Sequence, residues 1–230
     1  LKRQQDKLLA TERYEAWESV ARKLAHEIKN PLTPMRLSIQ TFERGFSKGE
    51  KFTKKRIKEF SDSLIQQIDT MSSIASAFSD FAEMPEPKKE KLNVVEVVEM
   101  AIDIFDRDVI KFNFSSKKIH ANFDRTQLIR IITNLLKNAF QAIPENRNPE
   151  IEVNISENNH EVKIAISDNG YGISKADMKR IFEPNFTTKS SGMGLGLSMI
   201  KNIINAYSGT ISFNTKSNVG TTFNITFPKN

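Results

Sequence analysis

Two stripes of apolar residues at helical spacing, separated by one glycine, limit how the first third of the chain can fold. The first stripe consists of Leu24, Ile28, Met35, Ile39, Phe42 and Phe46. The second follows two interleaved seven-residue series, Ile57, Leu64, Met71 and Phe78 with Phe60, Gln67, Ile74 and Phe81. Between the stripes, Gly49 in the segment Ser47–Lys51 permits a turn. The sequence therefore predicts two helices joined as an antiparallel hairpin.

The second stripe indicates that the hairpin packs against a partner, because one hairpin alone leaves much of this stripe, its apolar seam, exposed to solvent. Two copies packed as a four-helix bundle cover the seam, so we predict a homodimer. Gln67 interrupts the seam, and one polar core position can fix the register of such helices. We assign residues 23–83 to this helical domain and residues 1–22, which lack a clean heptad pattern, to a helical lead-in from an upstream region. A coiled-coil spacer without chemistry is the alternative.

The pattern changes after EMPEPKKEK, a charged segment with two prolines, from which we predict a linker at residues 84–91. Residues 92–230 then form a second domain. Its expected helices are 94–105, 125–143 and 195–207, and its expected strands are 110–115, 118–124, 150–156, 161–167, 209–215 and 221–227. Asp124 is placed to cap the second helix. This order predicts a mixed sheet with helices on one face, an α/β sandwich, and the α+β class for the whole chain.

Composition excludes several classes of protein. Hydrophobic residues make up 38% and charged residues 27% of the 230 residues, as in globular domains. No apolar run approaches the roughly 20 residues of a membrane span, and residues 1–20 contain no secretory signal. The absence of cysteine excludes disulfides and thiolate metal sites. The net charge is +6, but because basic runs such as Lys54–Arg56 are short, we favour a solvated surface over a nucleic-acid site.

Three polar clusters in the second half indicate chemistry, although each also has a structural explanation. In the first, Asn134 and Asn138 are four residues apart, so both amides lie on one side of a helix, and Gln141 continues that side. Amide oxygens can bind Mg²⁺. The same residues also suit the solvent-facing side of an amphipathic helix.

The second cluster follows a predicted strand, where Asp168 precedes Gly170 and Gly172. A carboxylate in this place can accept a hydrogen bond from the exocyclic amine of adenine. Glycines allow the backbone to approach a flat ring closely. A simple turn built from Asp, Asn and Gly is the alternative.

The third cluster, SGMGLGLSMIKNII, alternates Gly192, Gly194 and Gly196 before an apolar helix. N–H groups at such a helix start can bind phosphate oxygens. The spacing is not that of a Walker A loop, and a Rossmann turn would directly follow a strand. The preceding residues 182–191 show no regular pattern, and we expect them to form a lid over a ligand.

In their order along the chain, these clusters resemble the N, G1, F and G2 boxes of the Bergerat-type (GHKL) ATP-binding fold. Sensor histidine kinases, gyrase and MutL ATPases, and heat-shock chaperones of the ninety-kilodalton class share that fold. The segment AHEIKNPL resembles the H box of histidine kinases, and the longer AWESVARKLAHEIKNPLTPMRLS resembles NtrY-type nitrogen-regulation sensors in particular. The resemblance extends from about Arg22 to the end of the sequence.

This resemblance implies an ATP-dependent protein histidine kinase of a two-component system. His26 is the expected nucleophile, and Glu27 is expected to keep one ring nitrogen of the imidazole protonated. The next acceptor is expected to be an aspartate of a response-regulator receiver domain. Asn30 shares the helix side of His26, and related kinases use this position to place water, which implies a phosphatase activity towards the regulator. Hydrolysing relatives carry a glutamate where this chain has Asn134, so rapid attack by water is not expected.

The resemblance also implies a nucleotide site. Asn138 is the expected Mg²⁺ ligand, with Asn134 beside it. Asp168 is expected to accept from the adenine amine, and Gly172 to lie against the ring. The further residues expected at the nucleotide are Gly170, Lys189, Gly192, Gly194, Gly196 and Leu197.

One position departs from the pattern of many relatives, which carry a basic residue three places after the metal-binding asparagine. This chain has Gln141 there, so Lys189 is expected to neutralise the phosphate charge instead.

Two prolines follow the expected phosphoacceptor. Pro31 and Pro34 lack an N–H, so the carbonyls of Glu27 and Asn30 lose their helical partners. We expect a bend at this place and hypothesise that a signal from upstream enters through it.

Two other functions remain compatible with the sequence. One is a Bergerat-fold ATPase or serine/threonine kinase without histidine chemistry, and the other is a dimeric scaffold that binds nucleotide and signals by conformation alone. Full-length relatives are anchored in a membrane upstream, so the resemblance implies the cytoplasmic portion of an inner-membrane sensor. Contact with nucleic acid or with the membrane is not expected within these residues.

Overall fold

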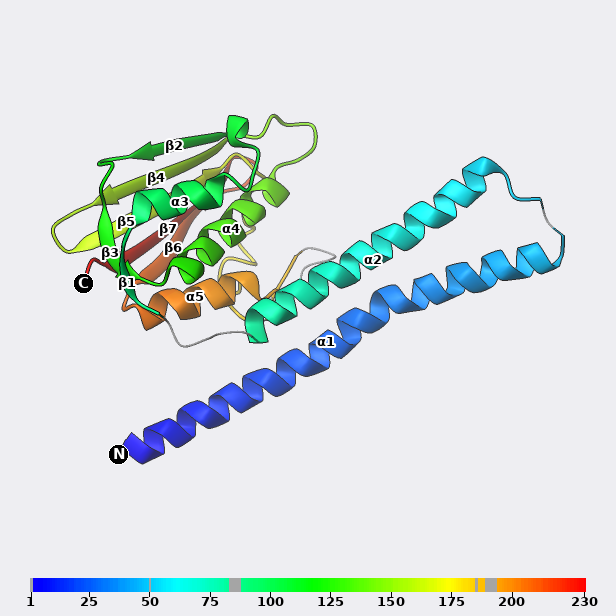
Figure 1. Cartoon of the computed structure of the whole chain (residues 1–230), viewed down its shortest axis with the longest axis horizontal. Coiled ribbons are helices and arrows are strands. Elements are labelled where there is room, and N and C mark those ends of the chain that lie inside the picture. The colour runs from blue at the N-terminus through cyan, green and yellow to red at the C-terminus, as the bar shows by residue number, and fades with distance from the viewer. Residues whose placement is uncertain (1, 50, 83–87, 185, 189–193) are drawn as a thin grey trace. The chain divides into compact units, whose positions relative to one another are not determined.

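The computed structural model describes the backbone of residues 2–49, 51–82, 88–184, 186–188 and 194–230, and the side chains of these residues apart from 2–23, 73 and 76–82. The chain forms two compact units (Figure 1). The first comprises Leu1–Glu83 with Thr187–Leu195, and the second comprises Met84–Phe186 with Gly196–Asn230. No helix in the described part of the chain combines the length and the apolar character of a membrane span.

Two long helices, α1 (Lys2–Ser47) and α2 (Lys54–Ala82), build the first unit. Gly49 follows α1 with a φ of 75°, a left-handed backbone that glycine adopts without strain, and its N–H donates to Phe46 O at 3.0 Å. The hydroxyl of Thr53 accepts a hydrogen bond from Arg56 N at 3.2 Å and caps α2. The predicted hairpin with a break at Ser47–Lys51 is therefore confirmed.

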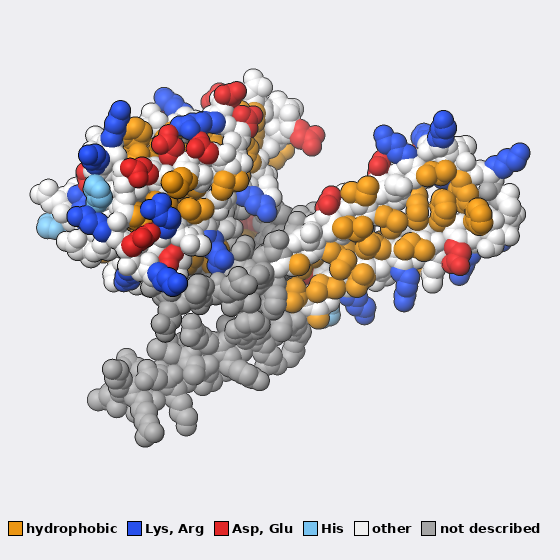
Figure 2. Space-filling view, viewed as in Figure 1, with side chains coloured by type: hydrophobic (Ala, Val, Ile, Leu, Met, Phe, Trp, Pro, Cys, Tyr) orange, Lys and Arg blue, Asp and Glu red, His pale blue; other side chains and the backbone are white. Residues whose placement is uncertain are grey.

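The two helices pack through an aromatic cluster beside the turn. Phe42 stacks on Phe52 and Phe60, with ring centroids 4.2 and 4.5 Å apart. Other apolar side chains of the hairpin remain 45–72% exposed, namely Leu32, Leu37, Ile39, Phe46, Ile57, Ile65 and Ile68. Figure 2 shows a band of hydrophobic side chains along the hairpin. A single hairpin thus leaves much of its apolar seam open to solvent.

A five-stranded sheet forms the centre of the second unit, with the strand order β2-β4-β5-β7-β6. Its strands are β2 (Ile110–Phe114), β4 (Ile151–Glu157), β5 (Glu161–Asp168), β6 (Thr210–Lys216) and β7 (Gly220–Pro228). β2 and β4 are parallel and the other neighbours are antiparallel, so the sheet is mixed, as predicted. A small second sheet pairs β1 (Glu90–Asn93) with β3 (His120–Phe123). β1 begins within the residues predicted as linker.

Three helices cover one face of the large sheet: α3 (Val94–Ile102), α4 (Arg125–Ala142) and α5 (Gly196–Ala206) (Figure 1). Alternate residues of β4 and β5, such as Val153 and Ile164, are fully buried beneath them. The short helix η1 (Arg107–Val109) leads into β2. α3 is shorter than predicted, because Asp106 caps η1 by accepting from Asp108 N at 3.2 Å. The α/β sandwich with helices on one face is confirmed.

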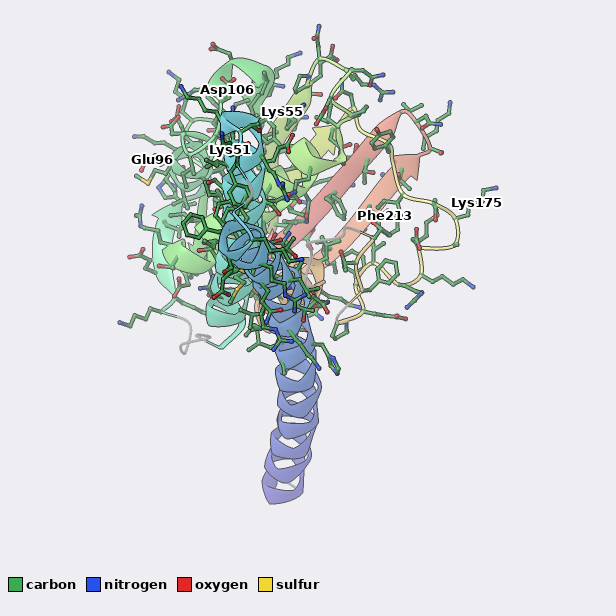
Figure 3. All side chains as sticks on the ribbon, turned by 90° about the vertical axis from the view of Figure 1, so that its right-hand side faces the viewer. Lys51, Lys55, Glu96, Asp106, Lys175 and Phe213 are labelled. Atoms are coloured by element: carbon green, nitrogen blue, oxygen red, sulfur yellow. The ribbon has the colours of Figure 1, made fainter. Side chains whose placement is uncertain are left out.

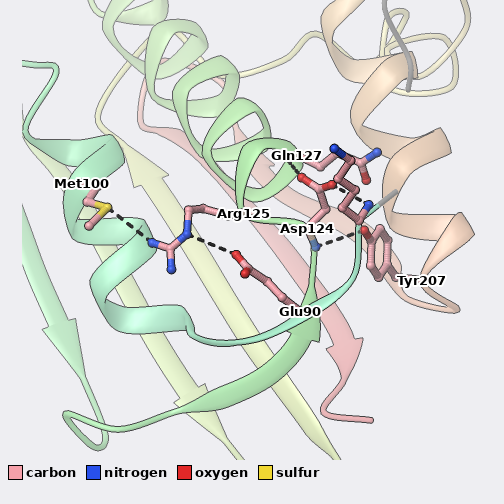
Figure 4. Close-up of polar contacts among 7 residues, drawn as sticks. Glu90, Met100, Asp124, Arg125, Gln127 and Tyr207 are labelled. Carbon is pink, nitrogen blue, oxygen red and sulfur yellow. Dashed lines mark hydrogen bonds and ion pairs between the residues drawn. The ribbon is translucent and has the colours of Figure 1, made fainter. Parts of the chain in front are cut away.

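Asp124 caps α4, as predicted, and also ties together distant parts of the unit (Figure 4). Its Oδ1 accepts from Gln127 N at 3.0 Å, and its Oδ2 accepts from Lys88 N at 2.8 Å. The Tyr207 hydroxyl accepts from Asp124 N at 3.1 Å. The start of α4 is thereby joined to the segment that enters the unit and to the end of α5.

Candidate functional site

The polar side of α4 faces the beginning of α5. Its apolar side, which includes Leu128, Ile132 and Leu136, is fully buried and fixes the orientation of the helix. The Nδ2 of Asn134 donates to the carbonyl of Arg130 at 2.9 Å. Because Gly196 lacks a side chain, α5 can approach Asn134 closely: a Cβ at position 196 would lie 3.3 Å from Asn134 Oδ1.

Asn138 lies half-buried one turn further along α4, on the same side as Asn134. Its amide oxygen belongs to the class of ligands that Mg²⁺ accepts. The polar side of α4 therefore offers two neighbouring amides next to the first residue of α5.

The beginning of α5 supplies backbone N–H groups that have no acceptor within their own helix. Gly194 precedes it with a φ of 67°, and Leu197 in the first turn is half-buried. These N–H groups can bind an anion such as a phosphate oxygen. Lys189 and Gly192, which the sequence also assigns to the nucleotide, lie outside the described residues.

Asp168 ends the central strand β5, and backbone N–H groups hold its carboxylate in place. Its Oδ1 accepts from Gly170 N at 2.8 Å and from Thr221 N at 3.2 Å. Glycine is required next to it, since a Cβ on Gly170 would lie 2.5 Å from Ala142 O. Gly172 has a φ of 73°, and a Cβ there would lie 2.5 Å from Lys216 O. The loop after β5 is thus packed against the end of α4 and against the β6–β7 turn.

Sequence reasoning missed the residues of the β6–β7 turn that complete this loop. Thr221 is buried beside Asp168, and Thr215 Oγ1 accepts from Ile173 N at 2.8 Å. A Cβ on Gly220, whose φ is 144°, would lie 1.9 Å from Asp168 O, so this position also requires glycine. Gly220 and Thr221 lie in the sequence GTTF, but their role depends on β7 pairing with β5, which local patterns do not reveal.

The expected phosphoacceptor lies in the other unit, on α1. His26 and Asn30 are exposed, and Glu27 is half-buried. Their spacing of four residues places His26 and Asn30 on one side of the helix. An exposed imidazole on a helix surface is accessible to a nucleotide and to a partner protein.

α1 continues without interruption through both prolines. Pro31 and Pro34 each remove one hydrogen bond of the helical ladder. Between them, the hydroxyl of Thr33 donates to the carbonyl of Lys29 at 3.1 Å, an interaction that often accompanies helix bending. The bend expected at this place stays a prediction.

Two family models match the chain. The His Kinase A (phospho-acceptor) domain matches residues 16–87, and the Histidine kinase-, DNA gyrase B-, and HSP90-like ATPase matches residues 123–230. The chain belongs to the sensor histidine kinases. Together the two models cover both the hairpin with His26 and the sandwich with Asp168, which confirms the resemblance.

Among relatives of this chain, the Nitrogen regulation protein NtrY of Azorhizobium caulinodans is 32% identical over 215 residues, or 90% of this chain and 28% of the relative. A "Putative sensor histidine kinase NtrY-like" of Rickettsia conorii is 32% identical over 231 residues, or 99% of this chain and 38% of the relative. The chain thus spans 28–38% of the length of these relatives.

Solved structures agree with the fold. The catalytic domain of the histidine kinase ThkA is 28% identical, with a TM-score of 0.55 over 62% of this chain and 96% of that chain. A structure of ThkA in complex with the response regulator protein TrrA has a TM-score of 0.75 over 96% of this chain and 64% of that chain. At 22% identity, the second comparison supports the fold alone.

Proposed function

We propose that this chain is the catalytic portion of an ATP-dependent protein histidine kinase in a two-component system. His26 takes the γ-phosphoryl group of ATP and passes it to an aspartate of a response-regulator receiver domain. The observation that supports this most strongly is the glycine-bordered carboxylate of Asp168 in the same chain as an exposed His26 that is followed by Glu27. ThkA, a structural relative, forms a complex with a response regulator.

The nucleotide site of the proposal lies in the second unit. Asp168, whose Oδ1 is oriented by two backbone N–H groups, accepts a hydrogen bond from the adenine amine. Gly170 and Gly172 allow the loop beside this carboxylate to pack tightly against Ala142 O and Lys216 O, which fixes its backbone. These features suit ATP.

The phosphate end of the nucleotide lies at the start of α5. The N–H groups there, with Gly194, Gly196 and Leu197, bind phosphate oxygens, and Lys189 and Gly192 contribute from the preceding segment. Asn138 supplies an amide oxygen to Mg²⁺, and Asn134 lies one turn before it. When bound, Mg²⁺ neutralises charge on the phosphates.

The chemistry at His26 is an in-line displacement. The neutral imidazole donates its lone pair to the γ-phosphorus, so that an N–P bond forms while the bond to the β–γ bridging oxygen breaks and ADP leaves. Glu27 orients the ring by accepting from its other nitrogen. Asn134 already donates to Arg130 O and cannot act as a base, so attack by water stays slow.

Further parts of the proposal concern regulation and assembly. Asn30 positions water for removal of phosphate from the regulator, and the exposed seam of the hairpin pairs two copies into a four-helix bundle. Residues 23–83 form the dimerisation and phosphotransfer domain, and residues 92–230 form the catalytic domain, which β1 extends back to Glu90. The expected membrane anchor of the full-length protein stays a prediction.

One incubation tests the central proposal. Purified protein with Mg²⁺ and γ-labelled ATP is expected to acquire a label that is lost in acid, as phosphohistidine is, and His26→Ala abolishes labelling. His120→Ala, which removes another exposed histidine, serves as the matched control and should label normally. Acid-stable label, or equal labelling of His26→Ala, overturns the proposal in favour of a serine/threonine kinase. Nucleotide binding without any label would instead indicate a scaffold.

A further inference from the structure

Arg147 is a charged residue near the loop after β5 to which the sequence patterns assign no role. It lies in the segment between α4 and β4, where its N–H donates to Pro144 O at 2.9 Å and fixes a turn. The side chain is half-buried. Its guanidinium points at backbone carbonyls of two other segments of the same unit.

The contacts of the guanidinium join these segments. Its Nη1 donates to the carbonyl of Asn169 and, at 3.2 Å, to the carbonyl of Gly170. Its Nη2 donates to the carbonyl of Asn218 in the β6–β7 turn at 3.4 Å. The planar fork of a guanidinium can serve several carbonyls at once, whereas a lysine ammonium acts as a single point of charge.

Asn169 reinforces the connection from its own side chain. Its Oδ1 accepts from Glu150 N at 3.1 Å, and its Nδ2 donates to Asn148 O at 2.9 Å. The segment 147–150 and the loop after β5 therefore hold each other through main-chain and side-chain groups of both partners.

The peptide groups on both sides of Gly170 are consequently fixed. The N–H of Gly170 donates to Asp168 Oδ1 at 2.8 Å, and its carbonyl accepts from Arg147. A shift of this glycine would move the group that orients the Asp168 carboxylate. We propose that Arg147 is a positioning residue for base recognition: by holding the backbone of Asn169 and Gly170 against the β6–β7 turn, it keeps Asp168 directed at the exocyclic amine of adenine.

This inference rests on the proposed nucleotide site and deepens it, so its test must separate base recognition from general stability. Inosine diphosphate carries a carbonyl oxygen in place of the exocyclic amine of ADP, so it offers no donor to the Asp168 carboxylate at that position. Titration calorimetry on the full chain with Mg²⁺ gives the dissociation constants of ADP and of inosine diphosphate. The ratio of the two constants measures how much the Asp168 carboxylate contributes to base recognition.

Arg147→Ala is expected to raise the dissociation constant of ADP about tenfold, while that of inosine diphosphate changes less than about twofold. Arg147→Lys keeps the charge but not the fork, and is expected to lose most of the preference for ADP. Millimolar methylguanidinium should partly restore ADP binding to Arg147→Ala. Arg125→Ala is the matched control, because Arg125 is an exposed arginine in the first turn of α4, where it pairs with Glu90 (Figure 4), whereas Arg147 follows the other end of that helix.

The inference is overturned if the ratio of the two dissociation constants is unchanged in both Arg147 variants. It is also overturned if both nucleotides bind more weakly by the same factor, which a structural role alone would produce. If Arg147→Ala does not unfold cooperatively, the ratio of the two dissociation constants in Arg147→Lys serves as the test instead. If the wild type binds no ADP or shows no preference for it over inosine diphosphate, the proposed nucleotide site itself is wrong.

Discussion

The two units of the chain differ in how completely they bury their own apolar side chains. In the second unit, Ile131, Ile132 and Leu136 are 0% exposed, within one continuous core of helices and sheet. In the hairpin, Phe46 is 72% and Ile65 is 55% exposed. The second unit thus buries its own apolar core, whereas the hairpin by itself leaves much of its apolar surface exposed.

Positive charge is concentrated at one place in the first unit, the tip of the hairpin. Residues 44–58, around the tip of the hairpin, hold seven of the 34 basic residues but one of the 28 acidic residues, a net of +6. The remainder of the chain has 27 residues of each sign and is neutral. Lys51 and Lys55 project from this tip in Figure 3. The ion pair of Lys55 with Glu59 spans 3.9 Å between mostly exposed side chains, so it neutralises little.

The largest expected effect comes from breaking the core of the second unit. Leu136→Ala removes a fully buried side chain from α4 and should lower the free energy of unfolding of this unit by about 2–5 kcal/mol. Denaturant titration checks this. Lys137→Ala, at the exposed neighbouring position, should stay within about 0.5 kcal/mol of wild type. Equal effects of the two substitutions would contradict the difference in burial.

Breaking the hairpin surface should affect assembly and leave the second unit intact. Ile65→Asp places a charge on the exposed apolar seam and should weaken the dimer at least about 100-fold, as measured by sedimentation at several concentrations. ADP affinity is expected to stay at the wild-type value. Gln66→Asp adds the same charge one position away and should leave the dimer largely unchanged. A fully dimeric Ile65→Asp protein would show that another surface pairs the two copies.

The salt dependence of dimer formation tests whether the charged tips of two hairpins lie close together. In a bundle whose two-fold axis runs along the helices, two tips of like charge meet, and added salt screens their repulsion. Raising the salt concentration from about 0.05 to about 0.5 M is therefore expected to tighten the dimer several-fold. Lys54→Gln combined with Lys55→Gln should reduce this dependence, while Lys117→Gln with Lys118→Gln, in the other unit, should not. A dimer that is indifferent to salt would place the tips at opposite ends.

The smallest expected effect concerns pH and belongs to the second unit. Burial raises the pKa of the Tyr207 phenol, and the charge of Asp124 acts in the same direction, while the hydrogen bond from its backbone opposes them. The protonated phenol is therefore favoured in the folded state. Its contribution to stability is complete below the ordinary pKa of 10.0 and is lost as the pH rises through the raised folded value. The melting temperature of the wild type should fall more between about pH 9 and 11 than that of Tyr207→Phe.

The elements and most of the candidate site follow from local patterns. The spacing of apolar residues gave the hairpin, and Asp124 before an amphipathic segment gave the start of α4. Asn134 and Gly196 were expected at one site, and the structure brings them together. What local patterns could not predict is which strands become neighbours. Thr221 meets Asp168 because β7 inserts between β5 and β6, and this order depends on the whole sheet.

Arg147 was missed for a different reason. It lies in PENRNPE, a segment without periodicity, and its partners are backbone carbonyls, which leave no trace in the residue types around them. Lys189 and Gly192 stay predictions, because they lie outside the described residues.

The hydrogen bond from Lys88 N to Asp124 has a mechanical consequence for the second unit. The same carboxylate that holds the incoming main chain also completes the first turn of α4, the helix that bears Asn134 and Asn138. Tension on the connection at Lys88 would be transmitted to that first turn and would tend to fray it. A pull on the incoming main chain would therefore act on the helix that bears Asn134 and Asn138 through a single carboxylate.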